Sequence, residues 1–209
     1  MFETLKRDIM LGELEPGEAL TELDLAARFS CSQGRVREAL LRLQDEGLVV
    51  RQGRRGTHVS TCTADEAVEM FRLRHMMECR AIRRTVKSPS RRLNDDLAAL
   101  VRAMEEAAEA NDEYLLAEID RDFHRRLFSD ANLPALQPIL HRCLVHNHRF
   151  KIAQSDEVRD LMMTAKRHWP IVEAVARRDG DEAVRLLGHH IATIVDVGDD
   201  IFADSGILP

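Results

Sequence analysis

The fold is decided by residues 21–59, TELDLAARFSCSQGRVREALLRLQDEGLVVRQGRRGTHV. Within this stretch, Thr21 is placed to cap a short helix, and Ser32 is placed to cap a second helix that ends at Gly47. Two short helices with a tight break between them are typical of a helix-turn-helix. Two β-prone runs then flank a turn rich in glycine and arginine, which predicts a hairpin. The stretch as a whole therefore predicts a winged helix-turn-helix.

One more helix is expected before this stretch, over residues 2–11, and a Pro-Gly turn follows it. The first domain, residues 1–60, is therefore expected to hold three helices and a β-hairpin wing. The N-terminus of the second helix of the helix-turn-helix would offer N–H groups to phosphates, and its arginines would reach phosphates or base edges in the major groove. The candidate DNA-binding residues are Ser32, Gln33, Arg35, Arg37, Arg42, Arg54, Arg55 and Gly56.

The charge of the chain is unevenly distributed. The net charge is -6, yet residues 28–55 carry seven arginines against three acidic residues. From Thr61 onward the balance reverses, with 21 basic and 26 acidic residues. A basic N-terminal module joined to an acidic C-terminal one is a common asymmetry in DNA-binding regulators. The alternative is a small helical subdomain whose basic face is only solvated.

The second domain, residues 61–209, shows nearly unbroken helical periodicity. Pro170 lies inside the fifth helical pattern, where it should kink that helix or mark its true start. The expected fold class is mainly α, with the winged helix-turn-helix followed by an all-α six-helix bundle. The expected helices of the bundle span residues 64–86, 89–110, 112–130, 133–152, 157–179 and 181–202.

The composition favours a soluble protein of the cytoplasm. Hydrophobic residues make up 44% of the chain, charged residues 32% and aromatic residues only 4%. The longest apolar stretch is shorter than the roughly 20 residues of a membrane span, and no secretory signal opens the chain. The four cysteines lie far apart, with no CxxC pair or zinc-finger spacing, so we expect buried or spare thiols.

Three of the nine histidines, together with one aspartate, stand in an arrangement that suits a metal ion. Asp120 and His124 are four residues apart on one expected helix, so both side chains leave the same face. His168 and His190 each precede an apolar pattern and can lie near the core edge of their helices. One carboxylate and three imidazoles would suit a divalent transition metal such as zinc, nickel, manganese or iron. Spacing alone does not show that three helices converge, and a lone helical histidine is usually a surface or core residue.

Motifs in both parts of the chain can be compared with known families. The first part carries Pro16-Gly17, Val36-Arg37-Glu38-Ala39-Leu40, Glu46-Gly47-Leu48-Val49 and Gly56-x-x-Val59. The second part carries Leu73-Arg74 with Glu78, Asp120-x-x-Phe123-His124-x-x-Leu127, His168-x-x-Ile171 and His190-Ile191. The first set resembles the winged-helix domain of the GntR family of bacterial transcription regulators. The second set resembles the FCD effector domain of its FadR-like subfamily, and together the two resemblances cover nearly the whole chain.

The resemblance implies roles for particular residues of the second domain. The implied metal ligands are Asp120, His124, His168 and His190, with His189 as the nearest competitor for the last position. Arg74 matches a family position that often meets an acidic effector in the cavity. The alternative role for Arg74 is an internal ion pair with Glu78 or Asp120.

One motif departs from the family pattern. At the start of the recognition helix the family commonly has Ser-Arg-Thr-Pro, whereas this chain has Ser32-Gln33-Gly34-Arg35. A glutamine can read adenine through a bidentate contact, whereas arginine favours guanine. We therefore expect the operator to differ from those typical of the family.

The expected function is that of a transcription regulator, a repressor that responds to a metabolite, and not an enzyme. A homodimer would place two winged helices on the half-sites of a palindromic operator in double-stranded DNA. The helical domain would dimerise and bind a small organic acid at its metal. Three alternatives stay open: a metal sensor with no organic effector, a metal-dependent hydrolase or lyase, and a bundle that only dimerises and whose histidines are structural.

Overall fold

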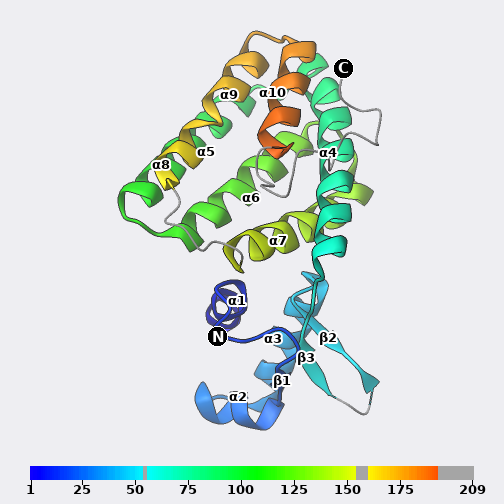
Figure 1. Ribbon diagram of the computed structural model, residues 1–209, viewed down its shortest axis with the longest axis vertical. Coiled ribbons are helices and arrows are strands. Elements are labelled where there is room, and N and C mark those ends of the chain that lie inside the picture. The colour runs from blue at the N-terminus through cyan, green and yellow to red at the C-terminus, as the bar shows by residue number, and fades with distance from the viewer. Residues whose placement is uncertain (54–55, 154–159, 193–209) are drawn as a thin grey trace. The chain divides into compact units, whose positions relative to one another are not determined.

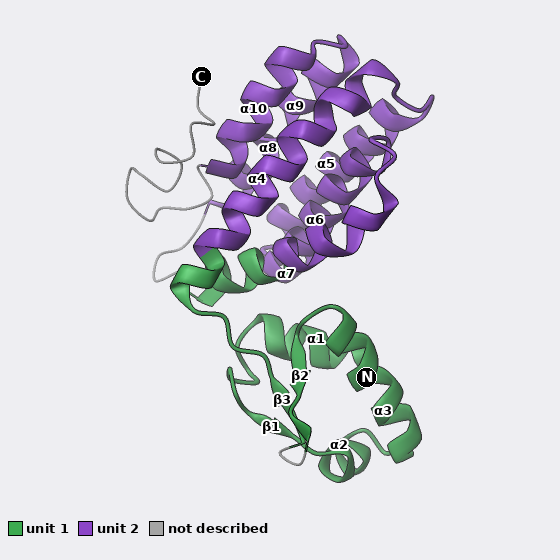
Figure 2. Ribbon diagram, turned by 90° about the vertical axis from the view of Figure 1, so that its right-hand side faces the viewer, with its two compact units in different colours: residues 1–67, 145–154 green, residues 68–144, 155–209 purple. Residues whose placement is uncertain are grey.

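The computed structural model describes residues 1–53, 56–153 and 160–192, which are mainly helical (Figure 1). The chain forms two compact units, shown in separate colours in Figure 2. Unit 1 contains residues 1–67 and 145–154, and unit 2 contains residues 68–144 and 155–209. No helix in the described ranges is long and apolar enough to cross a membrane.

Unit 1 contains the predicted winged helix-turn-helix. Its elements are α1 (Phe2–Met10), β1 (Ala19–Leu20), α2 (Glu22–Arg28), α3 (Gln33–Asp45), β2 (Val49–Arg51) and β3 (Thr57–Val59). The three strands form one antiparallel sheet in the order β1-β3-β2. The hairpin of β2 and β3 was expected, whereas β1 was not, because a strand of two residues carries no alternating pattern.

Side-chain caps and a glycine set the limits of the helix-turn-helix. Thr21 Oγ1 accepts from the Asp24 N–H at 3.1 Å and begins α2, and Ser32 caps α3 as the sequence indicates. At the other end of α3, Gly47 takes a φ of +80°. This left-handed residue lets the Leu48 N–H donate to the Leu43 carbonyl at 2.9 Å, which closes the helix. The helix-turn-helix is held by a small core of fully buried side chains: Leu5, Ile9, Val36, Leu43 and Leu48.

Unit 2 is formed by helices. They are α4 (Ala64–Lys87), α5 (Leu93–Glu109), α6 (Glu113–Ser129), the 3₁₀ turn η2 (Pro134–Leu136), α7 (Gln137–Ala153), α8 (Leu161–Lys166), α9 (Trp169–Ala176) and α10 (Gly180–Ala192). The first turn of α4 and the last part of α7 belong to unit 1. Helix α5 packs against α6, α8 and α9, and α10 packs against α9.

The described part of this region has seven α-helices where six were expected, because the predicted helix over 157–179 is interrupted. Pro170 lies in the first turn of α9, where its missing N–H is not needed for a helical hydrogen bond. The proline thus marks the start of a new helix, one of the two outcomes expected for it. Residues 157–159 and 193–202 of the predicted helices lie outside the described residues.

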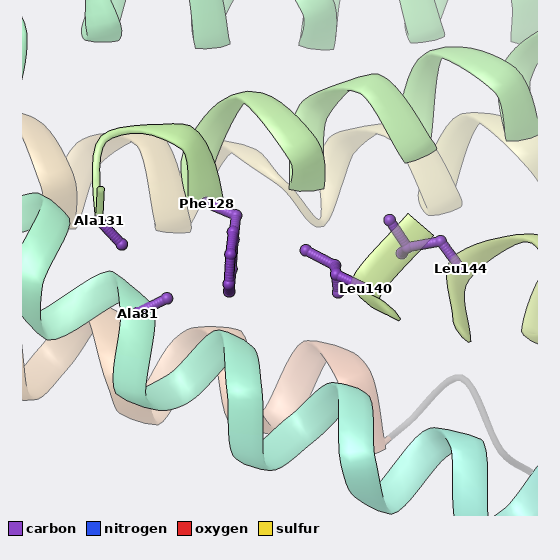
Figure 3. Packing of buried hydrophobic residues seen from close by; sticks show 5 residues of the cluster. All are labelled: Ala81, Phe128, Ala131, Leu140 and Leu144. Carbon is purple, nitrogen blue, oxygen red and sulfur yellow. The ribbon is translucent and has the colours of Figure 1, made fainter. Parts of the chain in front are cut away.

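A cluster of buried apolar side chains joins α4, the end of α6 and α7. Figure 3 shows the Phe128 ring with Ala81 and Ala131 on one side and Leu140 and Leu144 on the other. All five side chains are almost completely buried. The small alanines leave room for the ring between the helices, so this packing depends on Phe128.

We expect Phe128→Ala to lower the free energy of unfolding by about 3–5 kcal/mol, because it removes a buried ring and leaves a cavity. Urea unfolding measures this change. The matched control is Met163→Ala on α8, where the side chain is 61% exposed and the expected change is within about 0.5 kcal/mol. Equal losses in the two variants would contradict the packing described here.

Candidate metal centre and DNA-binding surface

Helix α6 positions the first two candidate ligands. Asp120 and His124 are one turn apart and both are buried. Phe123 and Leu127 on the same helix are also buried, and they fix this part of α6 in the core. The polar pair therefore faces the interior of the unit rather than solvent.

Two further helix ends bring the other candidate ligands to the same place. His168 is the N-cap residue of α9, and His190 lies in the last turn of α10. Both are buried, whereas His189 is exposed. The structure thus brings Asp120, His124, His168 and His190 together, and it places His189 outside the group.

The distances within this four-residue group are compatible with a metal centre. One ligand atom from each residue can be chosen so that all four lie within 4.8 Å of one another. His168 Nε2 lies 3.0 Å from Asp120 Oδ1, and His124 Nε2 lies 3.8 Å from Asp120 Oδ2. The His168 and His190 ring centroids are 4.3 Å apart. A single ion could therefore contact all four side chains.

Hydrogen bonds at the other ring nitrogens show which nitrogens can bind an ion. His168 Nδ1 lies 3.1 Å from the Ala165 carbonyl, and His124 Nδ1 lies 2.5 Å from Glu78 Oε2. A carbonyl and a carboxylate only accept, so each Nδ1 is the donor of its hydrogen bond, and in a neutral ring Nε2 then keeps the lone pair. Both Nε2 atoms are buried without a hydrogen-bond partner in the described part of the chain. Lone pairs on the two Nε2 atoms would face the negative Asp120 carboxylate. A cation bound between them would be attracted to all three groups.

The surroundings also favour the uncharged form of two imidazoles, those of His124 and His190, and metal ligation requires this form. Burial lowers the pKa of His124 and outweighs the opposing effect of the Glu78 charge. Burial, together with the neighbouring His168 and His124, lowers the pKa of His190 well below its ordinary value. Burial acts to raise the pKa of Glu78, but His124 and Arg74 outweigh it and hold that pKa below the usual range. The ionised form of Glu78 is therefore favoured where this carboxylate meets Arg74 and His124.

Arg74 lies next to this group and is fully buried. Its Nε donates to Glu78 Oε1 at 2.6 Å, so the ion pair with Glu78 forms. Its Nη1 and Nη2 have no hydrogen-bond partner among the described residues. A guanidinium with unused buried donors is suited to bind an anion.

Sequence reasoning missed the contact of Glu78 with His124. Glu78 was considered only as a partner for Arg74, four residues before it on α4. The contact with His124 joins residues 46 positions apart in the chain. Only the packing of α4 on α6 brings them together, and no local spacing indicates it.

The candidate DNA-binding residues fall into three groups. Ser32, Gln33 and Arg35 lie exposed at the N-terminus of α3. Arg37 instead donates to both carboxylate oxygens of Glu22 at 3.0 and 2.6 Å, and Arg42 lies over the Phe2 ring at 3.8 Å from its centroid. In the wing, Gly56 takes a φ of +84°, and Arg54 and Arg55 lie outside the described residues.

Comparison with protein families matches both parts of the chain. Residues 1–59 match the model of bacterial regulatory proteins of the gntR family, and residues 69–193 match the model of the FCD domain. The chain is a GntR-family regulator with an FCD domain. It is a DNA-binding transcriptional regulator and not an enzyme, which sets aside the hydrolase or lyase alternative.

Relatives and solved structures agree with this assignment. The HTH-type transcriptional repressor RspR of Escherichia coli K12 is 25% identical over 194 residues, which is 93% of this chain and 85% of that protein. The gluconate operon transcriptional repressor of Bacillus subtilis is 23% identical over 98% of this chain and 86% of that protein. Escherichia coli McbR/YncC shares the fold, with a TM-score of 0.77 at 19% identity over 98% of this chain and 96% of that chain.

We expect His190→Ala to lose the metal of the purified regulator, because it removes one of four converging ligands. His189→Ala is the matched control, since this neighbouring histidine is exposed and should leave the metal content unchanged. Elemental analysis of both variants beside the wild type measures the result. Loss of metal in His189→Ala with retention in His190→Ala would contradict the assignment.

Proposed function

We propose that this regulator is a repressor whose affinity for its operator is controlled by a small organic acid bound at a metal centre. The metal ligands are Asp120, His124, His168 and His190. The observation that carries the proposal is the buried lone pair on each of two Nε2 atoms, directed at Asp120. A divalent cation bound between them would satisfy these atoms.

The chemistry of the ligand set limits the metal. Three nitrogens and one carboxylate suit zinc, nickel, manganese or iron, whereas calcium and magnesium prefer oxygen ligands. A divalent ion in this site would act as a Lewis acid that holds an oxygen of the acid. Because Asp120 is the single ionised ligand, it does not neutralise a divalent cation, and an organic anion would complete the charge.

Arg74 supplies the second half of the acid site. Leaving a buried donor unsatisfied costs about 1–3 kcal/mol, and Arg74 has two terminal nitrogens in this state. A carboxylate accepts well from a guanidinium, often through two parallel hydrogen bonds. Sugar acids, short hydroxy acids and dicarboxylates all offer this group. The similarity to a gluconate operon repressor is consistent with the first of these classes.

The DNA-binding part would act as a homodimer on a palindromic operator in the cytoplasm. We assign it to residues 1–60, and we assign dimerisation and effector binding to residues 61–209. Gln33 and Arg35 are exposed at the start of α3, where Gln33 would read a base edge and Arg35 would contact a phosphate. The acid would bind one conformation of the dimer more tightly than the other. The ratio of these two affinities sets the largest change in operator affinity that the acid can cause.

We expect Arg74→Met to lose the response to organic acids while it keeps the metal. In a thermal-shift assay with zinc present, gluconate, lactate, malonate and citrate are the probes, and the wild type should be stabilised by at least one. Arg84→Met is the matched control, because Arg84 donates to the Ala131 carbonyl in the same unit. If Arg74→Met were stabilised like the wild type, Arg74 would not bind the acid. Metal control of DNA binding with no response to any acid would favour a metal sensor.

We expect Arg35→Ala to weaken binding to duplex DNA and to make the plot of log affinity against log salt shallower by about 1, because one phosphate contact is lost. Fluorescence anisotropy with a labelled random-sequence duplex measures this slope. Arg92→Ala is the control, because Arg92 is an exposed arginine of unit 2. An unchanged slope in Arg35→Ala would remove Arg35 from the DNA interface.

A further inference from the structure

Glu78 on α4 is a buried carboxylate whose two oxygens hold two different groups. Oε1 accepts from Arg74 Nε at 2.6 Å, and Oε2 accepts from His124 Nδ1 at 2.5 Å. All three side chains are at most 2% exposed. One of these partners is a candidate metal ligand and the other is the candidate anion-binding arginine, so Glu78 lies between the two halves of the site.

We propose that Glu78 is a positioning residue that keeps the His124 proton on Nδ1 and thereby reserves Nε2 for the metal. A neutral imidazole has two tautomers, and only one of them carries a lone pair at Nε2. A carboxylate cannot donate, so Glu78 selects that tautomer and fixes the orientation of the ring. This inference rests on the proposed function, because it concerns the same metal centre.

The same carboxylate also positions Arg74. Because Oε1 holds Nε, the guanidinium cannot turn that edge toward another ligand, and Nη1 and Nη2 remain for an anion. A simple structural ion pair between Arg74 and Glu78 would be complete on α4 alone, four residues apart. The contact with His124 on α6 is an addition that such a pair does not need, and it directs Glu78 at the metal centre.

Glu78→Gln is the informative variant, because an amide cannot serve both partners. If its oxygen accepts from His124 Nδ1, its NH₂ group faces the Nε–H of Arg74, and two donors oppose each other. If its oxygen accepts from Arg74, its NH₂ group donates to His124 Nδ1, which moves the histidine proton to Nε2. The second arrangement removes the lone pair that the metal needs. The first arrangement places a donor against the charged guanidinium, so we expect the second, and the size of the side chain is kept in both.

The experiment measures the affinity of the metal-free full chain for zinc alone by competition with a chelator. We expect Glu78→Gln to bind zinc about 10- to 100-fold more weakly than the wild type, the usual loss when a carboxylate behind a ligating histidine is removed. Asp130→Asn is the matched control, because Asp130 is a partly buried carboxylate that accepts from Arg126 and from the Ser90 N–H. It should bind zinc like the wild type. Thermal unfolding of each metal-free variant separates a loss of affinity from a loss of folding.

A second measurement needs no variant. The ¹⁵N chemical shifts of the histidine rings in the metal-free wild type report the tautomer of His124, assigned by comparison with His124→Ala. The proposal requires a protonated Nδ1 and an unprotonated Nε2, and the opposite tautomer would overturn it even if Glu78→Gln failed to fold. Wild-type zinc affinity in a folded Glu78→Gln would also overturn it. If His124→Ala nevertheless lost zinc, the proposed metal ligands would stand and only the role of Glu78 would be rejected. No zinc binding by the wild type would instead reject the proposed function.

Discussion

The burial of polar ligand atoms inside a helical unit is the constraint on which the rest of unit 2 depends. Four side chains that could bind a metal converge where a bundle normally packs apolar groups. Because these side chains are buried, their polar atoms need partners other than bulk water. Glu78 and the Ala165 carbonyl satisfy the outer nitrogens of two rings, while Phe123 and Leu127 hold α6 in the core. The Nε2 atoms of His124 and His168 then remain available for a cation. The same contacts that pack the helices therefore also orient the candidate ligands.

The sequence predicts the winged helix-turn-helix and the helical second region, and the spacing of Asp120 and His124 places both on one face. It does not predict that His168 and His190 meet them, because periodicity gives faces and not the packing of helices; the family resemblance supplied that pairing. Choosing His190 over His189 also depended on the resemblance, and burial now separates them. Glu78 at the metal centre and the short strand β1 had no local signal, since both depend on contacts between distant residues.

Unit 1 shows that the number of arginines in a helix-turn-helix does not by itself identify the DNA-binding surface. Arg37 and Arg42 are part of the arginine-rich pattern of the recognition helix, yet one is bound to Glu22 and the other lies over Phe2. Arg51 on β2 also lies near Glu22, at 3.7 Å. DNA would have to exchange these contacts for its phosphates. Among the described residues, the exposed start of α3 could bind DNA without exchanging such contacts.

The break between α8 and α9 matters when metal ligands are assigned to relatives from sequence motifs. The Ala165 carbonyl at the end of α8 accepts from the His168 N–H at 3.2 Å and lies 3.1 Å from His168 Nδ1. A relative in which α8 ran on without interruption would keep all four ligands in its sequence and still lack a centre of this geometry. Ligand motifs alone would not distinguish such a relative from this chain. The helix boundary is thus as diagnostic as the ligands themselves.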